Sequence, residues 1–263
     1  MAGYLGTEQQ ARLQRRVDQH YGWLVDQPGA CDAGRMLGCD DAERLGWEQL
    51  LALLRRDGAV AFRLLPATIL EALRSRLAGD GYGLDTWDVF VAPAAVARRA
   101  IAPLLAKALP DDLHLAGLGE DPEGQPVRSL QGFLLEHGIA PFSGSQLLGR
   151  RSPAVTLALA DAAGRWVAAA HCYLPHNRHS QHHRWAWGGL VCVAPFARGR
   201  GLGGLINALI VEAAIGRLGA DWIYELVSSG NVASRRMVEA SGLRLDPMLV
   251  CGIASQGGAR YTR

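Results

Sequence analysis

The 263-residue chain has no long apolar run and little net charge, and each absence argues against a class of protein. No segment approaches the roughly 18 consecutive apolar residues of a membrane-spanning helix. Residues 1–7 lack the basic segment and apolar core of a secretory leader, so we expect a cytoplasmic protein. A net charge of +2 is too small to indicate a basic surface for nucleic acid. These absences predict a soluble globular protein with one large or two small cores.

Cysteine is scarce, odd in number and scattered along the chain. Three of the five cysteines fall in segments that we predict to be strands, where a free thiol packs as a small hydrophobe. We therefore expect reduced, structural thiols. They are Cys31, Cys39, Cys172, Cys192 and Cys251.

A turn rich in glycine and arginine, residues 198–204, is the most informative feature that is present. It follows the apolar run 190–193 and precedes a segment with helical spacing of apolar residues. The start of a helix presents unpaired backbone N–H groups and the positive end of the helix dipole, and glycine lets a phosphate approach closely. This turn predicts a site for a phosphorylated cofactor.

Two common phosphate-binding motifs fit this turn poorly. A P-loop ends in Gly-Lys-Ser or Gly-Lys-Thr, whereas Gly204 is followed by leucine and isoleucine. Gly199, Gly201 and Gly204 match the dinucleotide pattern G-x-G-x-x-G, and Glu225 lies near the distance expected for a ribose-binding acid. However, four residues separate the strand from the turn, and too little chain follows for a doubly wound sheet.

Arg198, Gly201 and Gly203 match the pattern R/Q-x-x-G-x-G/A, and this part of the sequence resembles the GNAT superfamily of acyl-CoA N-acyltransferases. The flanking order also agrees, with an apolar strand ending at Pro195, a long helix, a strand, and Asn231 opening a short helix. The resemblance covers about residues 112–253 and is most specific over 187–243. It implies an α/β fold with a GNAT-like mixed, mostly antiparallel sheet flanked by helices, and acetyl-CoA as cofactor.

The C-terminal part of the chain, 111–263, is the predicted GNAT acyltransferase domain. Apolar spacing with periods of two and 3.6 residues distinguishes its strands from its helices. The predicted strands are 113–118, 154–160, 165–173, 185–193, 222–227 and 247–253, and the predicted helices are 126–137, 202–218 and 232–241.

The N-terminal region, 1–110, is predicted to be mainly helical or α+β. Its strand–helix–strand order and an echo between residues 81–86 and 242–247 leave two interpretations open, an unrelated helical region and a partial, degenerate GNAT copy. The predicted helices are 7–24, 41–56, 68–77 and 94–109, the last interrupted at Pro103, and the predicted strands are 59–65 and 84–91.

The resemblance assigns most of the cofactor contacts. In this family the pantetheine arm lies along the fourth strand, where a backbone N–H group, here of Val193 or Cys192, polarises the thioester carbonyl. The glycine turn holds the pyrophosphate, and an asparagine element lies beside the thiol. The implied cofactor-binding residues are Val191, Cys192, Val193, Arg198, Gly199, Arg200, Gly201, Leu202, Gly203, Gly204, Asn231 and Ser234.

The catalytic residues are less clear, because the sequence departs from the family pattern twice. The glutamate frequent on the fourth strand is missing, and Val238 stands where a tyrosine often protonates the leaving thiolate. Glu225 is the first candidate for the general base, provided that burial raises its pKa. His171 is a second candidate for the base, and Tyr224 is a candidate for the acid. Solvated or packed side chains are the alternative for all three.

Four histidines within eight residues, 176–183, also suggest a site. Imidazole binds zinc, but the spacing matches no closed zinc site and no cysteine joins the run, so we expect no metal. Contact with the acyl acceptor, by these histidines and Arg178 or Arg184, is the other functional interpretation, and a solvated loop without a site is the structural alternative. Trp185 and Trp187 could line an acceptor pocket or pack in the core. Gly188 and Gly189 predict either a bulge that opens the cofactor cleft or space for these tryptophans.

The sequence therefore predicts an N-acetyltransferase that transfers an acetyl group from acetyl-CoA to an amine. The acceptor would be a small molecule or a peptide, with direct transfer in a ternary complex. A CoA-binding regulatory or scaffolding protein without turnover is the alternative, since both expected acid and base positions are altered. A homodimer is compatible with the sequence, and no nucleic-acid or membrane partner is expected.

Overall fold

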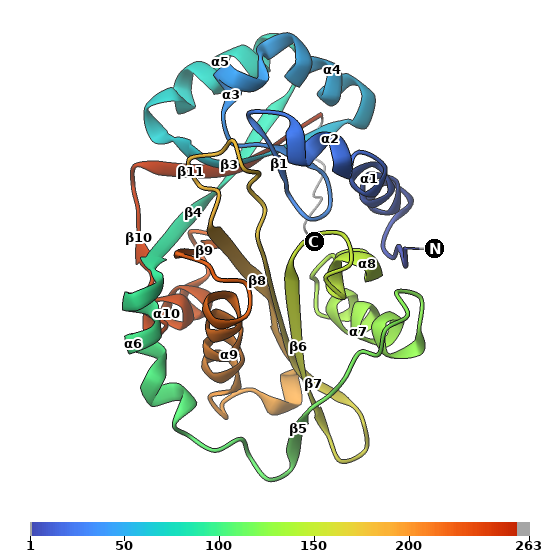
Figure 1. Cartoon of the computed structure of the whole chain (residues 1–263), viewed down its shortest axis with the longest axis vertical. Helices are drawn as coiled ribbons and strands as arrows, with labels where there is room; N and C mark the ends of the chain where they lie inside the picture. The colour runs from blue at the N-terminus through green and yellow to red at the C-terminus, as the bar shows by residue number, and fades with distance from the viewer. Residues whose placement is uncertain (1, 257–263) are drawn as a thin grey trace.

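The computed structural model describes residues 2–256 as a mixed sheet with helices packed against it (Figure 1). The strands lie in the order β1-β2-β3-β11-β4-β9-β8-β7-β6-β5, and β10 pairs with β4. The pairs β2–β3 and β8–β9 are parallel, and the other pairs in the described part are antiparallel. This arrangement confirms the predicted mixed, mostly antiparallel α/β fold. No helix among residues 2–256 is long and apolar enough to cross a membrane.

The elements of the C-terminal half follow the predicted order, and two short ones, α8 and β10, are additional. Most boundaries lie within three residues of the prediction. The elements are β5 (Leu113–Leu115), α7 (Gln125–Glu136), α8 (Gly144–Leu147), β6 (Ala154–Asp161), β7 (Trp166–Tyr173), β8 (Trp185–Val193), α9 (Leu202–Gly216), β9 (Trp222–Val227), α10 (Val232–Ala240), β10 (Arg244–Leu245) and β11 (Leu249–Ser255).

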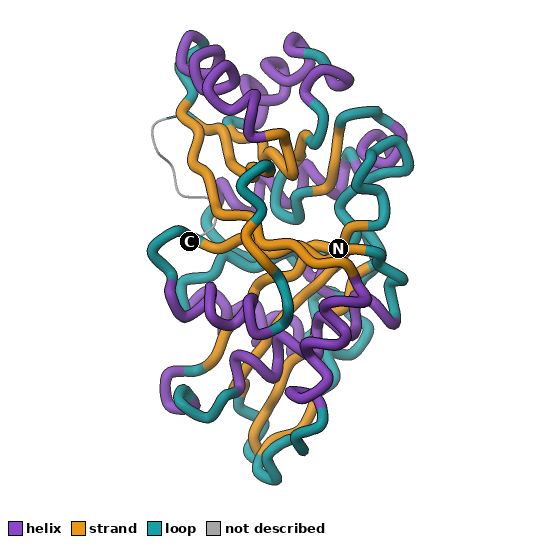
Figure 2. Tube along the Cα trace, turned by 90° about the vertical axis from the view of Figure 1, so that its left-hand side faces the viewer, coloured by secondary structure: helices purple, strands orange, loops and turns teal. Residues whose placement is uncertain are grey.

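Helices cover both faces of this part of the sheet, and Figure 2 shows them on either side of the strands. On one face α9 buries Ile206, Ile210 and Val211, each at most 1% exposed. Full burial of one such side chain contributes roughly 1.5–3 kcal/mol. On the other face α7 packs Leu130 and Leu134 against the sheet. The strands are therefore held rigidly where the candidate site lies.

The N-terminal half contains two strands that the sequence did not reveal, β1 (Ala30–Asp32) and β2 (Leu37–Cys39). Each has three residues, too few for an alternating pattern to be recognised. The expected helix 94–109 ends at Leu105 and continues through Pro103. The other elements are α1 (Glu8–Gln19), α2 (Tyr21–Asp26), α3 (Ala42–Leu45), α4 (Trp47–Asp57), β3 (Ala59–Pro66), α5 (Leu70–Gly79), β4 (Gly83–Pro93) and α6 (Ala94–Leu105).

The two halves repeat one pairing scheme. β1 is antiparallel to β2, and β2 is parallel to β3. In the same way, β7 is antiparallel to β8, and β8 is parallel to β9. A helical segment connects the two parallel strands in each case, α3–α4 in the first half and α9 in the second.

The halves also exchange strands. β4 lies between β9 and β11, and β11 lies between β3 and β4. β4 therefore precedes residue 110 in the sequence and belongs to the predicted N-terminal region, but in the fold it pairs with β9 of the C-terminal half. Because each half completes the other's sheet, we expect them to fold as one cooperative unit.

Candidate active site

The parallel strands β8 and β9 separate in the middle of the sheet. Their pairing runs from Trp185 opposite Trp222 to Gly188 opposite Glu225 and then stops, although β8 continues to Val193. The edge of β8 after Gly188 therefore has no partner strand on the side of β9, which leaves backbone groups available to a ligand.

A bulge lies beside this opening, but not where the glycines suggested. Between Gly189 and Cys192, β8 spans three steps while its partner β7 spans two, from His171 to Ala169. The extra residue falls at Leu190 or Val191, and Leu190 adopts a φ of 52°, unusual for a residue with a side chain. The predicted bulge at Gly188 and Gly189 is thus displaced toward Leu190.

The two glycines clear space for neighbouring side chains instead. A Cβ atom on Gly189 would lie 2.3 Å from the Trp187 ring, and one on Gly188 would lie 3.2 Å from the side chain of Glu225. Trp187 packs on Tyr173 with ring centroids 5.5 Å apart. Trp185 stacks on Trp222 at 4.8 Å and does not line the cavity described below.

The glycine-arginine turn lies at the end of β8 and leads into α9. Gly199 and Gly201 have φ values of 81° and 76°, in the left-handed region that glycine adopts without strain. A Cβ on either residue would meet nothing within 4 Å, so the space beside the turn is open. Gly201 caps α9 without a side-chain bond, and the first N–H groups of the helix have no acceptor within it. The turn therefore fits a phosphate group.

The two arginines of the turn differ. The guanidinium of Arg200 pairs with Asp112, with N–O distances of 2.6 and 3.0 Å. The exposed side chain of Arg198 makes no hydrogen bond or ion pair with another residue of the described chain. Of the two, only Arg198 can meet an anion without first breaking an ion pair.

A cavity of about 240 Å³ begins where β8 and β9 separate and reaches into the N-terminal half. It is bounded by both strands, by the start and inner face of α10, and by strands β3, β4 and β11. Its lining comprises residues 187–191 and 225–228, Asn231, Ser234, Met237, Val238, Gly138, Ile139, Ala33, Arg35, Met36, Ala61, Arg63, Trp87 and Ile253.

Glu225 is the acidic residue in this lining. It is 3% exposed, and burial raises the pKa of its carboxyl to about 7, while a hydrogen bond from Asn207 opposes the rise. Asn207 Nδ2 donates to Glu225 Oε1 at 3.0 Å and to Ser241 Oγ at 3.0 Å. The carboxyl is thus held in one position and can exchange a proton near neutral pH.

Tyr224 and His171 do not line the cavity. Tyr224 is fully buried, its hydroxyl lies 3.2 Å from His176 Nε2, and burial raises its pKa well above the usual value. His171 is fully buried against Phe142, with Nδ1 2.8 Å from Thr156 Oγ1, and burial lowers its pKa to about 3. Of the three catalytic candidates, the structure brings only Glu225 to the cavity.

The asparagine element lies at the cavity wall. Asn231 caps α10, accepting a hydrogen bond from Ser234 N at 3.0 Å, and both residues line the cavity. One turn further along the same helix, Val238 is 1% exposed and also lines it. An apolar side chain therefore occupies the place where the resemblance led us to look for a tyrosine.

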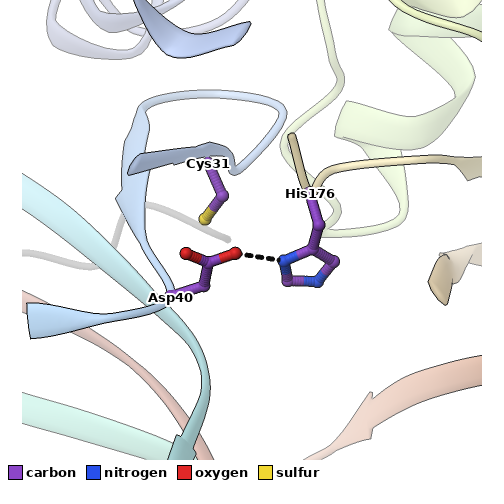
Figure 3. A group of neighbouring side chains, drawn as sticks. All are labelled: Cys31, Asp40 and His176. Atoms are coloured by element: carbon purple, nitrogen blue, oxygen red, sulfur yellow. Dashed lines mark hydrogen bonds and ion pairs between the residues drawn. The ribbon is translucent and has the colours of Figure 1, made fainter. Parts of the chain in front are cut away.

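The fold brings two of the four histidines together, because the ring centroids of His176 and His182 lie 5.5 Å apart. His176 is buried beside Cys31 and Asp40, with its Nδ1 2.7 Å from Asp40 Oδ2 (Figure 3). Candidate ligand atoms of these three residues lie within 4.8 Å of one another, so they could hold a metal ion. The Asp40–His176 hydrogen bond and the contact with Tyr224 account for the geometry without one. Sequence spacing could not reveal this group, because its members come from distant parts of the chain.

The arginines beside the histidine run have partners elsewhere. Arg178 pairs with Asp26 at 2.8 Å, and Arg184 pairs with Asp221 at 2.9 Å. By contrast, Arg35 and Arg63 line the cavity and were missed in the sequence. The position of Arg63 inside the apolar run 59–65 was the available signal, since a charged residue in a buried strand is uncommon without a role.

A mixed sheet that opens between two parallel strands, beside a glycine-rich helix start, places this chain in the GNAT fold class. Residues 131–243 match the sequence model of the "Acetyltransferase (GNAT) family", the family that the motifs indicated. No curated protein matches the sequence.

Three solved structures share this fold at 14% identity. A GCN5-related N-acetyltransferase from Kribbella flavida aligns over 97% of this chain and 98% of its own, with a TM-score of 0.55. A Drosophila protein aligns over 94% and 89%, with a TM-score of 0.55. A tandem GNAT protein from the clavulanic acid biosynthesis pathway aligns over 81% and 69%, with a TM-score of 0.51. The likeness concerns the fold alone, and it extends across most of the chain.

Proposed function

We propose that this protein is an N-acetyltransferase that uses acetyl-CoA to acylate an amine in a ternary complex. The observation that carries the proposal is the position of Glu225, a buried carboxyl with its pKa raised to about 7, in the cavity that opens between β8 and β9. A general base with a pKa near the working pH transfers protons most effectively.

The surrounding residues fit acetyl-CoA, which supplies an activated acyl thioester when bound. The turn 198–204 would hold the pyrophosphate, with the N–H groups at the start of α9 and Arg198 meeting its charge. The free edge of β8 would hydrogen-bond the pantetheine arm, and the N–H of Cys192 or Val193 would polarise the carbonyl. Asn231 and Ser234 would line the thiol end.

In the proposed reaction Glu225 takes the proton that the amine must lose. The nitrogen forms the new bond to the acyl carbon as the bond from that carbon to sulfur breaks. Asn207 keeps the carboxylate oriented during this step, because its amide donates to Glu225 Oε1. Since the described cavity offers no tyrosine in place of Val238, the sulfur leaves as thiolate or is protonated by water. An ordinary thiol pKa near 8.5 permits this.

Val238 also favours a second candidate function, a protein that binds CoA without turnover. The two functions are separated by incubating the purified protein with acetyl-CoA and a panel of amines while following free thiol. Thiol release that depends on an amine supports the transferase. Tight CoA binding in calorimetry, with no amine-dependent release across the panel, supports the binding protein.

A further inference from the structure

Among residues 2–256, the side chains of Arg35, Arg63 and Arg151 are buried, and their partners differ. Arg151 is buried against two carboxylates, Asp18 at 2.8 Å and Asp32 at 3.1 Å. Arg35 and Arg63, which are 7% and 6% exposed, form no ion pair with a carboxylate in residues 2–256. Buried charges in proteins are normally paired, because removing an ion from water is costly.

The hydrogen bonds of Arg35 and Arg63 leave their charge uncompensated. Arg35 donates from Nε to the carbonyl oxygen of Ala140 at 2.7 Å, and a second guanidinium nitrogen donates to the same oxygen. Arg63 donates to the carbonyl oxygen of Ala33 at 3.3 Å, and its Nε is buried without a partner among the described residues. Carbonyl oxygens satisfy donors but carry no full negative charge.

The four ionisable groups that act most strongly on Arg63 are neutral. Its ionisable neighbours include the phenols of Tyr173 and Tyr224 and the thiols of Cys31 and Cys251. Burial raises the pKa of each of them, so they hold their protons near pH 7. None of these four groups supplies the missing negative charge.

The two cations also lie near each other. Burial lowers the pKa of Arg35 to about 9, and the positive charge of Arg63 contributes to that decrease. Both residues line the cavity that contains Glu225. Trp187, whose ring lies 6.0 Å from the Arg63 guanidinium, has a buried Nε1 that also lacks a partner among the described residues. One cavity thus presents two guanidinium groups that have no counter-ion among the described residues, although Arg35 also lies 4.7 Å from the Phe142 ring, and it presents further unused donors.

We propose that the acceptor is a small amine that also carries a carboxylate, and that Arg35 and Arg63 bind this carboxylate. The inference rests on the proposed function and specifies its substrate class. Guanidinium groups suit a carboxylate, because their planar donors match its two oxygens. A volume of about 240 Å³ is below the roughly 300–1,000 Å³ of pockets for drug-sized ligands, which favours an amino-acid-like molecule over a peptide.

The direct test compares amines that differ only in the anion. The purified protein is given acetyl-CoA with each of the protein amino acids and, separately, with the amide of each. We expect the accepted amino acid to have a kcat/KM at least about 30-fold above that of its amide, because the amide leaves two buried cations unpaired. Equal or better use of the amides would overturn the inference.

Variants locate the effect at the two arginines. In Arg63→Met and in Arg35→Met, the ratio of kcat/KM for the amino acid to kcat/KM for its amide should fall toward one, because the KM for the acid increases. Arg63→Lys should keep part of the preference for the acid. Arg98→Met, which removes a surface arginine paired with Glu212, is the control and should keep the full preference. A preference that survives in both methionine variants would contradict the assignment.

A binding measurement separates this inference from the proposed function, because it needs no turnover. The amino acids that bind should raise the Tm of the wild-type protein, whereas their amides should not, and Arg63→Met should abolish the increase. If the acids raise the Tm but no amine is acetylated, the transferase proposal fails and the carboxylate site stands. If amines are acetylated but no acid raises the Tm more than its amide does, the carboxylate site fails and the transferase stands.

Discussion

Two cationic regions in the described part of the chain are built in opposite ways. The turn 198–204 is exposed, contiguous in sequence and based on backbone N–H groups at a helix start. The pair Arg35 and Arg63 is buried and based on side chains, and the fold brings it to the cavity from the N-terminal half. The first region suits a phosphate at the surface, and the second suits a small anion enclosed by protein.

This difference explains why a family signature can identify the acyl donor but not the acceptor. A turn that binds the shared donor needs a fixed local conformation, so it leaves a short motif in the sequence. A pocket for the acceptor needs only side chains that meet in space, and the residues that line this cavity come from both halves of the chain. In our proposal the C-terminal half binds the acyl donor, and the N-terminal half contributes acceptor specificity.

Replacing Gly201 should have the largest effect on the donor region. Gly201→Asp places a carboxylate beside the pyrophosphate, and such like-charge contact should weaken CoA binding by about 1,000-fold in calorimetry. Gly164→Asp is the matched control, since Gly164 also has a positive φ and open space around it but lies in the turn between β6 and β7. Unchanged CoA affinity in Gly201→Asp would contradict the cofactor assignment.

Replacing Glu225 should remove the chemistry and keep the donor region intact. Glu225→Gln should lower kcat by about 100- to 10,000-fold, the usual contribution of a general base, with little change in CoA affinity. In the wild type, kcat/KM should rise as the pH passes about 7, where the Glu225 carboxyl loses its proton, and the variant should lose this limb. Glu212→Gln, an exposed glutamate on α9, is the control. A variant with wild-type activity would show that another group is the base.

The same carboxyl should make stability depend on pH. Because the pKa of Glu225 is raised from 4.5 to about 7 on folding, the folded state favours the protonated form, and this stability is lost as the pH rises through 7. The free energy of unfolding of Glu225→Gln relative to wild type should therefore increase by about 3 kcal/mol from pH 4.5 to pH 8. Denaturant unfolding at a series of pH values measures it, and a difference that does not vary with pH would contradict the raised pKa.

The buried arginines allow a comparison within one molecule. Arg151→Met leaves the buried Asp32 and the partly buried Asp18 without their cation and should cost about 3–5 kcal/mol in the free energy of unfolding. Arg63→Met removes a cation that has no counter-ion and should leave the protein at least as stable as wild type. Urea unfolding of both variants checks this. An equal loss in the two would indicate that Arg63 is a structural residue.

The smallest predicted effect is a difference in CoA affinity between variants of the two arginines of the turn, Arg198 and Arg200. The side chain of Arg198 has no hydrogen-bond or ion-pair partner in the described chain, whereas Arg200 is paired with Asp112. Arg198→Met should weaken CoA binding by about tenfold through one lost charge-assisted contact, and Arg200→Met by less. Calorimetry of the two variants under the same conditions gives the ratio of their dissociation constants for CoA. The reverse order would show that Arg200 leaves Asp112 to meet the cofactor.

The sequence predicted the helices and strands that are marked by a periodic apolar pattern or by turn residues close to their ends. The strands 185–193 and 222–227 were predicted with their observed boundaries, because apolar runs between clear turn signals mark them. The strands of three residues, β1 and β2, were missed because they are too short to show a period. The exchange of β4 and β11 between the halves was also missed, since no local pattern reports which strands become neighbours.

The residues of the candidate site differ in the same way: some could be predicted from local sequence, and others could not. Glu225 could be proposed as a base because it lies within the predicted strand 222–227, in a known order of elements. Arg35, by contrast, lies in a segment without a recognised pattern, and its meeting with Ala140 joins positions 105 residues apart. His176 drew notice for its histidine neighbours, yet its partner Asp40 is 136 residues away. Contacts of this kind depend on the assembled fold rather than on local sequence.

The measurement that tests the account most directly is the release of free thiol from acetyl-CoA by the wild-type protein and Glu225→Gln, with the amino acids and their amides as acceptors. We expect amine-dependent release by the wild type, faster with free acids and increasing through pH 7, and a loss of about 100-fold or more in the variant. Tight CoA binding without amine-dependent release from any acceptor would contradict the account and leave a CoA-binding protein in its place.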